Sequence, residues 1–307
     1  MLIHKIQNRL NEELYIQKYI EKLNKLLARI EQRMNNVFVK AQQDGVWSQS
    51  ELAKYNRDAK LKKAVREEIA QFTKEVKNDL RNDLAALYKQ EALYTQNLLR
   101  RVTQLGITTE FDSLPTTAIK SQVVDLMTIK GKTLTEYVSK YGQDIAFRIE
   151  QEIWESIALG ENPRKTAKRL ADLNSYMQNR IEMTVRSWNL AIQNQANLMV
   201  YEQAGIEKVR YLATLDSRTC AVCAADHNKV MNNDNVIPLP RHPNCRCAYA
   251  PEIKGLTSEA RGYDEWLLDP SRTEEELRQV KDTIELFMRK RKISKNEGKY
   301  LLSLIRR

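Results

Sequence analysis

The sequence predicts a mainly α fold, with long amphipathic helices, a small β-rich cysteine-stapled module near the C-terminal third and a basic helical tail. Two observations predict the helices: the 307 residues include only nine Gly and seven Pro, and apolar residues recur at helical spacing. A third observation predicts the module, because all four cysteines fall between Tyr211 and Pro251. Apolar residues alternate at the start of that stretch, as they do in short strands.

The first long helix is expected to present one apolar face. Its seam residues are separated alternately by four and three positions: Ile16, Ile20, Leu23, Leu27, Ile30, Met34 and Val37. Coiled coils use this heptad spacing, but the run lasts only about three heptads. We therefore expect the helix to pack against the rest of its own domain rather than against a second chain.

A second amphipathic run follows after a short break. Ser48 is expected to cap the new helix, with Glu51 reaching back from the third position. The apolar residues of the run are Leu61, Val65, Ile69, Phe72, Val76, Leu80, Leu84 and Leu87. Gly106 marks its expected end, and Pro115 lies in the connection that follows.

From residue 118 onward the predicted helices are shorter, over residues 133–141, 143–159 and 175–204. Gly160 and Gly205 are expected to end the second and the third of them. Asn162 is placed to cap a helix that begins at the next residue, a proline whose missing N–H costs nothing there.

Beyond residue 205 the predicted elements are strands, followed by a terminal helix. The strands are expected around residues 209–213, 229–231 and 246–250. The terminal helix is expected to be capped near Ser271 or Thr273. The chain therefore divides into four predicted regions: 1–117, a long-helix region; 118–205, a helical core; 206–253, the β-rich Cys/His module; and 254–307, a linker with a basic helix.

The charge balance favours a polyanionic partner. Lys and Arg number 50 against 40 Asp and Glu, which gives a formal charge of +10 and a pI near 9.3. Charge alone does not choose among nucleic acid, an acidic protein and a membrane surface. The predicted nucleic-acid contact is the terminal cluster Arg289, Lys290, Arg291, Lys292 and Lys295, for which a solvated helix face is the alternative.

The sequence contains no run of 18 or more apolar residues, and its first ten residues lack the apolar core of a secretory signal. We therefore expect no membrane association and a cytoplasmic protein. Disulfides are disfavoured in that reducing compartment, so clustered cysteines are better explained by metal binding.

The cysteine spacing predicts a structural zinc site. A Cys-x-x-Cys turn places two thiolates on one side, and a later pair of ligands can complete a tetrahedron. Five residues compete for the four positions: Cys220, Cys223, His242, Cys245 and Cys247. His227 is a poorer candidate, because it follows the first pair too closely. The alternatives are four small buried thiols, or a disulfide formed later in an oxidising exterior.

The same residues could instead form an active site. A zinc deaminase needs His-x-Glu before Pro-Cys-x-x-Cys, whereas here the Cys-x-x-Cys comes first. A zinc-dependent HNH-like nuclease remains the enzymatic alternative, because Asp226, His227, His242 and Asn244 supply its residue types. Three histidines in all leave little material for such a site, and the chain has no Walker loop or Gly-x-Ser-x-Gly elbow. We therefore expect no enzymatic activity.

Two segments carry a family resemblance. GIEKVRYLATLDSRTCAVC, from Gly205 to Cys223, and PRHPNCRC, from Pro240 to Cys247, closely resemble the C-terminal signature of the tailed-phage minor head proteins, the Mu F-like head-morphogenesis family. GENPRKTA, from residue 160 to 167, is similar as well, and the resemblance covers roughly residues 140–253. One departure lies at residues 186–189, Arg-Ser-Trp-Asn, where the family commonly has Arg-Thr-Glu.

The resemblance implies a minor capsid protein of the virion, present in few copies and associated with the portal and the procapsid interior. Its implied partners are the portal protein, a scaffold or major capsid protein, and the packaged double-stranded DNA. Its implied location is the host cytoplasm during assembly and then the virion head interior. Asp216 and Arg218 match the family motif, and we expect them to support a turn rather than to catalyse. The remaining alternative is a generic DNA-binding module of a mobile element.

Overall fold

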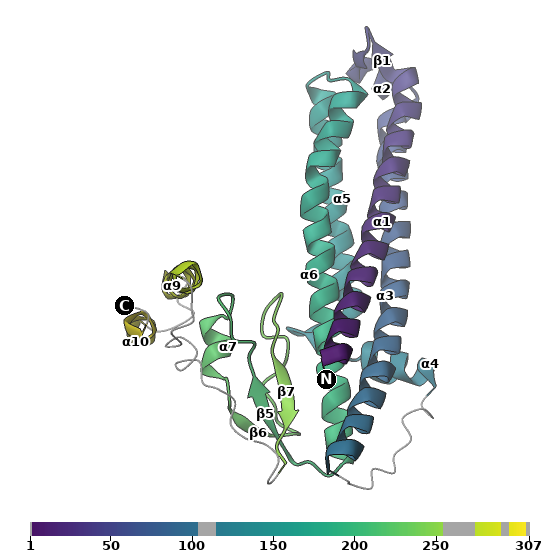
Figure 1. Ribbon diagram of the computed structural model, residues 1–307. Helices are drawn as coiled ribbons and strands as arrows, with labels where there is room; N and C mark the ends of the chain where they lie inside the picture. The colour runs from purple at the N-terminus through teal and green to yellow at the C-terminus, as the bar shows by residue number, and fades with distance from the viewer. Residues whose placement is uncertain (1, 104–114, 254–273, 290–294, 305–307) are drawn as a thin grey trace. The chain divides into compact units, whose positions relative to one another are not determined.

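The computed structural model describes residues 2–103, 115–253, 274–289 and 295–304 (Figure 1). Helices hold 73 % of the chain and strands 8 %, which confirms the predicted mainly α fold with a small strand module. The chain forms two compact units, one of residues 1–87 and 114–189 (unit 1) and the other of residues 88–113 and 190–307 (unit 2). Two of the three dividing points fall inside long helices, α3 (Arg57–Thr103) and α6 (Pro163–Gln203).

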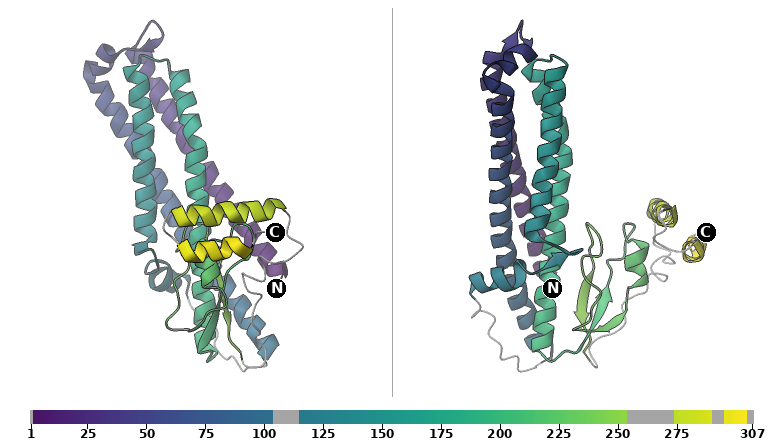
Figure 2. Two further views of the ribbon diagram at one scale, coloured as in Figure 1. Left: turned by 90° about the vertical axis from the view of Figure 1, so that its left-hand side faces the viewer. Right: turned by 180° about the vertical axis from the view of Figure 1, so that it is seen from behind.

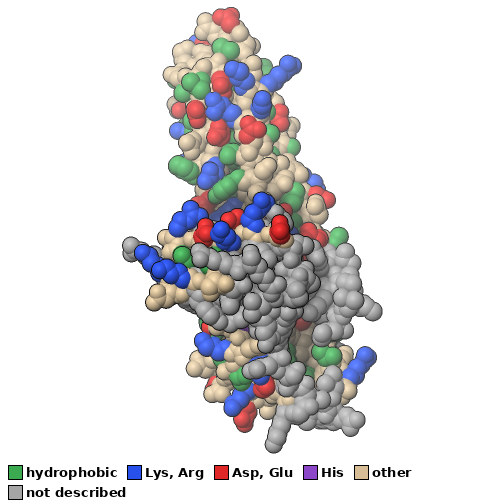
Figure 3. Space-filling view, turned by 60° about the vertical axis from the view of Figure 1, so that its left-hand side comes forward, with side chains coloured by type: hydrophobic (Ala, Val, Ile, Leu, Met, Phe, Trp, Pro, Cys, Tyr) green, Lys and Arg blue, Asp and Glu red, His purple; other side chains and the backbone are tan. Residues whose placement is uncertain are grey.

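Unit 1 is a bundle of long helices. Figures 1 and 2 show α1 (Leu2–Ala41), α5 (Leu134–Ala158) and the unit 1 parts of α3 and α6 lying side by side. All eight predicted apolar residues of the second run, from Leu61 to Leu87, are buried. Basic and acidic side chains are interspersed on the outer surface of these helices (Figure 3). One ion pair of unit 1 joins Arg169 to Glu161, in the turn before α6, at 2.9 Å.

The seam of α1 differs in part from the prediction. Ile16, Leu23, Ile30 and Met34 are buried as expected, but Tyr19 and Leu26 occupy the intervening buried positions. Ile20 and Leu27, which the heptad pattern favoured, are only half-buried. The buried residues from Ile16 to Met34 are therefore 3, 4, 3, 4 and 4 positions apart, which averages the 3.6 residues per turn of a straight helix rather than the 3.5 of a heptad repeat.

The end of α1 leads into α3 through short elements. A two-stranded hairpin, β1 (Gln42–Gln43) and β2 (Val46–Trp47), precedes α2 (Gln49–Ala53) and a 3₁₀ turn at Lys54–Asn56. Ser48 caps α2 as predicted, since its hydroxyl accepts the N–H of Glu51. The Glu51 carboxylate, which was expected to reach back to the cap, instead pairs with Lys54.

The two helices expected at residues 133–141 and 143–159 are one continuous helix, α5. Gly142 lies inside this helix and does not break it. A Cβ atom at that position would overlap the hydroxyl of Thr73 on α3. The glycine therefore serves the close approach of two helices rather than a turn. At the start of α5, Thr133 and Glu136 form a capping box that the sequence prediction missed.

The helix expected at residues 175–204 begins earlier, at Pro163, and is α6. The Asn162 side chain caps it by accepting the N–H of Lys165 at 3.1 Å, as predicted. Gly160 and Gly205 both adopt positive φ angles, of 61° and 71°, and thereby end α5 and α6.

Unit 1 also contains short elements before α5. These are α4 (Thr116–Ile119), a π-helical turn (Lys120–Val124), and the hairpin of β3 (Thr128–Ile129) and β4 (Lys132–Thr133). Arg81 on α3 binds Asp125 through two hydrogen bonds, which attaches this segment to the bundle.

Unit 2 contains the strand module. Its antiparallel sheet has the order β6-β5-β7, with β5 (Lys208–Leu212) in the centre, β6 (Val230–Asn232) and β7 (Ala248–Pro251) at the edges. The short helix α7 (Ala221–Ala225) lies between β5 and β6 in the chain. The three predicted strands are therefore confirmed, with boundaries moved by one or two residues.

The C-terminal helices are α9 (Glu274–Arg289) and α10 (Lys295–Leu304), which contact each other. Of the predicted basic cluster, Arg289 and Lys295 are exposed at the facing ends of these two helices. Lys290, Arg291 and Lys292 lie outside the described residues. A search of the described helices finds no segment apolar and long enough to cross a bilayer.

Candidate metal centre

The first half of the centre is the Cys-x-x-Cys turn at the start of α7. Cys220 has an extended backbone and stands at the N-cap of α7, where its Sγ accepts the N–H of Cys223 at 3.4 Å. Because this hydrogen bond closes the turn, the two thiols lie on the same side of it. Both side chains are buried.

The second half is the turn from His242 to Cys247. The N–H of Cys245 donates to the carbonyl of His242 at 3.2 Å, and Asn244 between them has a φ of 59°. Asn tolerates this left-handed conformation better than most residues, because its short polar side chain relieves the local clash. The turn places Cys245 and Cys247 in the buried interior of the module.

The ring of His242 is oriented as in a metal ligand. Its Nδ1 lies 2.8 Å from the carbonyl oxygen of Pro243, which can only accept, so Nδ1 carries the proton. The other ring nitrogen, Nε2, faces the sulfurs of Cys220 at 3.2 Å and Cys223 at 3.3 Å, and it is the atom that a metal would bind once it is unprotonated. Metal-bound histidines typically have their second nitrogen held in this way by a carbonyl or a carboxylate.

Two overlapping groups of side chains could hold a metal ion: Cys220 with Cys223 and His242, and Cys223 with Cys245 and Cys247. In each group the ligand atoms lie within 4.8 Å of one another, and Cys223 belongs to both. Ordinary zinc–sulfur and zinc–nitrogen bonds place the S and N ligands of a tetrahedral ion about 3.5 Å apart. The observed separations from Nε2 are close to that value, and all four thiols are free of disulfides.

The thiols perturb one another strongly. Hydrogen bonding from Cys223 and from His242 lowers the pKa of Cys220, and hydrogen bonding from Cys223 and Cys247 lowers the pKa of Cys245. The pKa of Cys223 is raised, because it donates to Cys220 and Cys245. The lowered pKa values of Cys220 and Cys245 favour thiolates, for which a soft cation is the natural counter-charge.

Asp216 supports the loop before the Cys-x-x-Cys, and its main partner is one that the sequence prediction missed. Its Oδ1 accepts the N–H of Arg218 at 2.8 Å, which is the expected Asx turn. The guanidinium of Arg218 stays 3.6 Å away and is largely exposed. Arg246 instead forms a bidentate pair with Asp216 and holds the pKa of that carboxyl below its usual value.

This pair ties the two halves of the centre together, because Arg246 lies between Cys245 and Cys247 in the chain. A second tie runs from Asp226, at the end of α7, to Arg241 at 2.6 Å, directly before His242. The two ion pairs therefore link the loop containing the first cysteine pair to the loop containing the second.

His227 closes the end of β5. Its Nδ1 accepts the N–H of Ala213 at 3.0 Å, and the preceding residue, Asp226, is engaged by Lys229 and Arg241. Asn228 follows with a φ of 67°, a left-handed conformation that asparagine tolerates better than most residues. Asp226 and His227, two of the residues that favoured an HNH-like site, thus hold the turn after α7.

Helix α6 supports the second cysteine pair from within unit 2. The Oδ1 of Asn194 accepts the N–H of Tyr249 at 3.1 Å, and its Nδ2 donates to the carbonyl of Cys247 at 3.4 Å. The Asn194 amide thus bonds two backbone groups at the edge of β7, as a neighbouring strand would. Seven residues further on, the hydroxyl of Tyr201 donates to the carbonyl of Tyr249 at 3.4 Å.

The sequence that forms this centre is similar to a class of phage proteins, those of the phage head. Residues 148–250 match the family described as Phage Mu protein F like protein. The matched segment takes in the end of α5, the whole of α6 and the strand module, and it confirms the resemblance that the two signature segments indicated. No curated protein and no solved structure is significantly similar to the chain.

Proposed function

We propose that the protein is a minor head protein that is associated with the portal and the procapsid interior during assembly and remains inside the virion head. The observation that carries the proposal is the family match over residues 148–250, which includes every residue of the candidate metal centre. Its partners are then the portal protein and a scaffold or major capsid protein, met first in the host cytoplasm.

The centre holds a structural zinc ion in this proposal. Cys220, Cys223 and His242 supply three ligands, and Cys245 and Cys247 compete for the fourth position. Five protein ligands for four positions leave no place for water or substrate, which is the difference between a structural and a catalytic zinc site. The module is therefore a rigid surface for assembly rather than an active site.

The packaged double-stranded DNA is the proposed polyanionic partner of the basic tail. The cluster from Arg289 to Lys295 has five cations in seven residues on a chain of net charge +10. Each phosphate contact releases counterions, so affinity should fall as salt rises. Replacing Lys290, Arg291 and Lys292 by Glu should weaken duplex binding at low salt and flatten its salt dependence.

Co-purification with the portal ring tests the head-assembly role. The tagged chain, expressed with the portal, scaffold and major capsid proteins from its own genome, should co-sediment with portal rings and procapsids. Absence of the chain from rings, procapsids and finished heads would contradict the proposal. Cleavage of supercoiled plasmid that depends on added metal and disappears in His227→Ala would establish a nuclease instead.

A further inference from the structure

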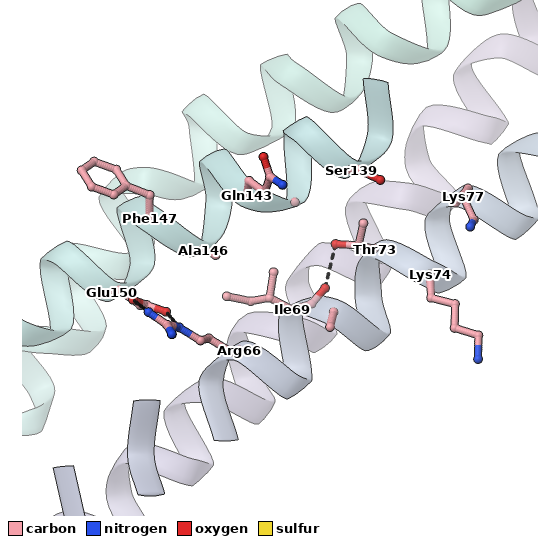
Figure 4. A pocket seen from close by; sticks show the side chains of 12 residues that line it. Arg66, Ile69, Thr73, Lys74, Lys77, Ser139, Gln143, Ala146, Phe147 and Glu150 are labelled. Carbon is pink, nitrogen blue, oxygen red and sulfur yellow. Dashed lines mark hydrogen bonds and ion pairs between the residues drawn. The ribbon is translucent and has the colours of Figure 1, made fainter. Parts of the chain in front are cut away.

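A groove of about 550 Å³ lies within unit 1, between α3 and α5 (Figure 4). The α3 side extends from Arg66 to Lys77, and the α5 side extends from Ser139 to Glu150. Eleven residues of helix span about 16 Å, so the groove is about three helical turns long. It belongs wholly to unit 1 and is remote in sequence from the Cys/His module.

The floor of the groove is made of small side chains. Ala70 and Thr73 from α3 face Gly142 and Ala146 from α5, and they leave room that larger residues would fill. Phe147 projects from the edge with 71 % of its surface exposed. An exposed aromatic ring beside a hollow with small apolar side chains is typical of a surface that another chain covers.

The charges along the groove are unequal. At one end Arg66 and Glu150 form a bidentate pair at 2.6 and 2.9 Å and so neutralise each other. Toward the other end Lys74 and Lys77 extend from α3, and in the described part of the chain neither has an ion-pair partner. The groove therefore has a net positive rim.

We propose that this groove binds an amphipathic, acidic helix of a partner protein. Apolar side chains one turn apart on that helix would pack on the small residues of the floor and against Phe147, as ridges pack into grooves between helices. Its acidic residues would pair with Lys74 and Lys77. A nucleic acid fits the surface less well, because phosphates gain nothing from the alanine floor and the phenyl ring. The proposal rests on unit 1 alone and does not depend on the head-assembly role.

Two designed peptides of about 18 residues, long enough for five turns, test the binding without knowledge of the partner. Both carry leucine at heptad positions a and d, and they differ only in having glutamate or lysine at the flanking positions. By fluorescence anisotropy the glutamate peptide should bind wild-type protein about tenfold more tightly than the lysine peptide, since two exposed ion pairs are at stake. Equal affinities would overturn the proposal.

Variants of the groove locate the site. Ala146→Trp fills the floor without changing charge and should abolish binding, whereas the double substitution Lys74→Glu and Lys77→Glu should reverse the preference between the two peptides. Lys25→Glu, the same change at an exposed position of α1 outside the groove, is the matched control and should leave both affinities unchanged. Binding that survives Ala146→Trp would place the peptide elsewhere and overturn the proposal.

Two further outcomes name other occupants and would also overturn it. Concentration-dependent self-association that Phe147→Glu removes, seen by sedimentation velocity, would make a second copy of this chain the occupant. Displacement of the glutamate peptide by duplex DNA at the concentration that saturates the protein would make the groove an anion-binding surface.

Discussion

The helix bundle of unit 1 and the strand module of unit 2 are held together in opposite ways. In the bundle, long helices bury continuous apolar stripes, such as the one from Leu61 to Leu87, and the contributions are spread over many side chains. In the module the sheet is three strands wide, and its loops are joined by ion pairs and by a group of buried thiols. The bundle distributes its stability, whereas the module concentrates it in a few groups.

The size of the module explains the difference. Its residues, about 206–253, form a segment near the length below which an apolar core alone is rarely sufficient. Small domains of this kind usually depend on disulfides or a metal, and the thiols here are free. Loss of one ligand should therefore unfold the module, while loss of one apolar side chain should only weaken the bundle.

Replacing Cys223 by Ser should have the largest effect, because Cys223 belongs to both groups of potential ligands. Wild-type protein purified without chelator should contain about one zinc per chain, and the variant less than about half. Hydrogen exchange should show β5 and β7 losing their protection while α1 and α5 keep theirs. Asn235→Ser, at an exposed position of the module, is the control and should retain both zinc and protection. Wild-type protein without zinc would contradict the metal centre.

Replacing Phe72 by Ala should weaken the bundle without touching the module. The ring is fully buried in unit 1, and such truncations cost about 3–5 kcal/mol of unfolding free energy. Denaturant titration followed by circular dichroism measures the loss, and elemental analysis should find the zinc content unchanged. Phe147→Ala removes an exposed ring from the same unit and should cost less than about 0.5 kcal/mol. Loss of zinc in Phe72→Ala would show that the two regions do not have separate sources of stability.

Replacing Asn194 by Ala should loosen the module from the helix side. Two buried backbone groups, the N–H of Tyr249 and the carbonyl of Cys247, lose their partner, at a cost of about 2 kcal/mol. Hydrogen exchange at Tyr249 should accelerate, and the affinity for zinc should fall, because the carbonyl belongs to a ligand residue. Gln195→Ala, the exposed neighbour on α6, should change neither quantity. An unchanged exchange rate at Tyr249 would show that Asn194 does not support β7.

The contrast between the bundle and the module also explains which parts of the structure can be predicted from the sequence. Apolar periodicity located the buried stripe of α3 from Leu61 to Leu87, and the caps Ser48 and Asn162 were recognisable from their own neighbours. The division expected between residues 141 and 143 was wrong, because the glycine there allows the close approach of Thr73 from a different helix. Sequence patterns thus predict helices and caps, which depend on neighbouring residues. They do not predict contacts between residues that are far apart in the chain.

In the module, residue type located the candidate ligands but not what holds them. The spacing of the cysteines and of His242 was enough to bring five residues together as candidates. Arg246 and Asn194 were missed, since their partners lie 30 and 53 to 55 positions away in the chain. Arginine and asparagine are common on surfaces, so neither carries a signal until the fold shows the group that it binds.

The smallest expected effect is a pH-dependent one at the turn between α5 and α6, where Glu161 binds Arg169. The hydrogen bonds from Arg169 hold the pKa of Glu161 below its ordinary value of 4.5. The ion pair is therefore fully present above pH 4.5, and its contribution disappears as the pH falls through the lowered pKa of the folded state. Glu161→Gln should melt at a lower temperature than wild type at pH 7, and the difference should close in strong acid. Comparing the two proteins at the same pH cancels any loss of metal from the module.

Glu67→Gln, whose pair with Lys63 is longer at 3.9 Å and exposed, should show almost no difference at either pH. A gap for Glu161→Gln that persists unchanged in acid would show that the bundle gains nothing from this ion pair.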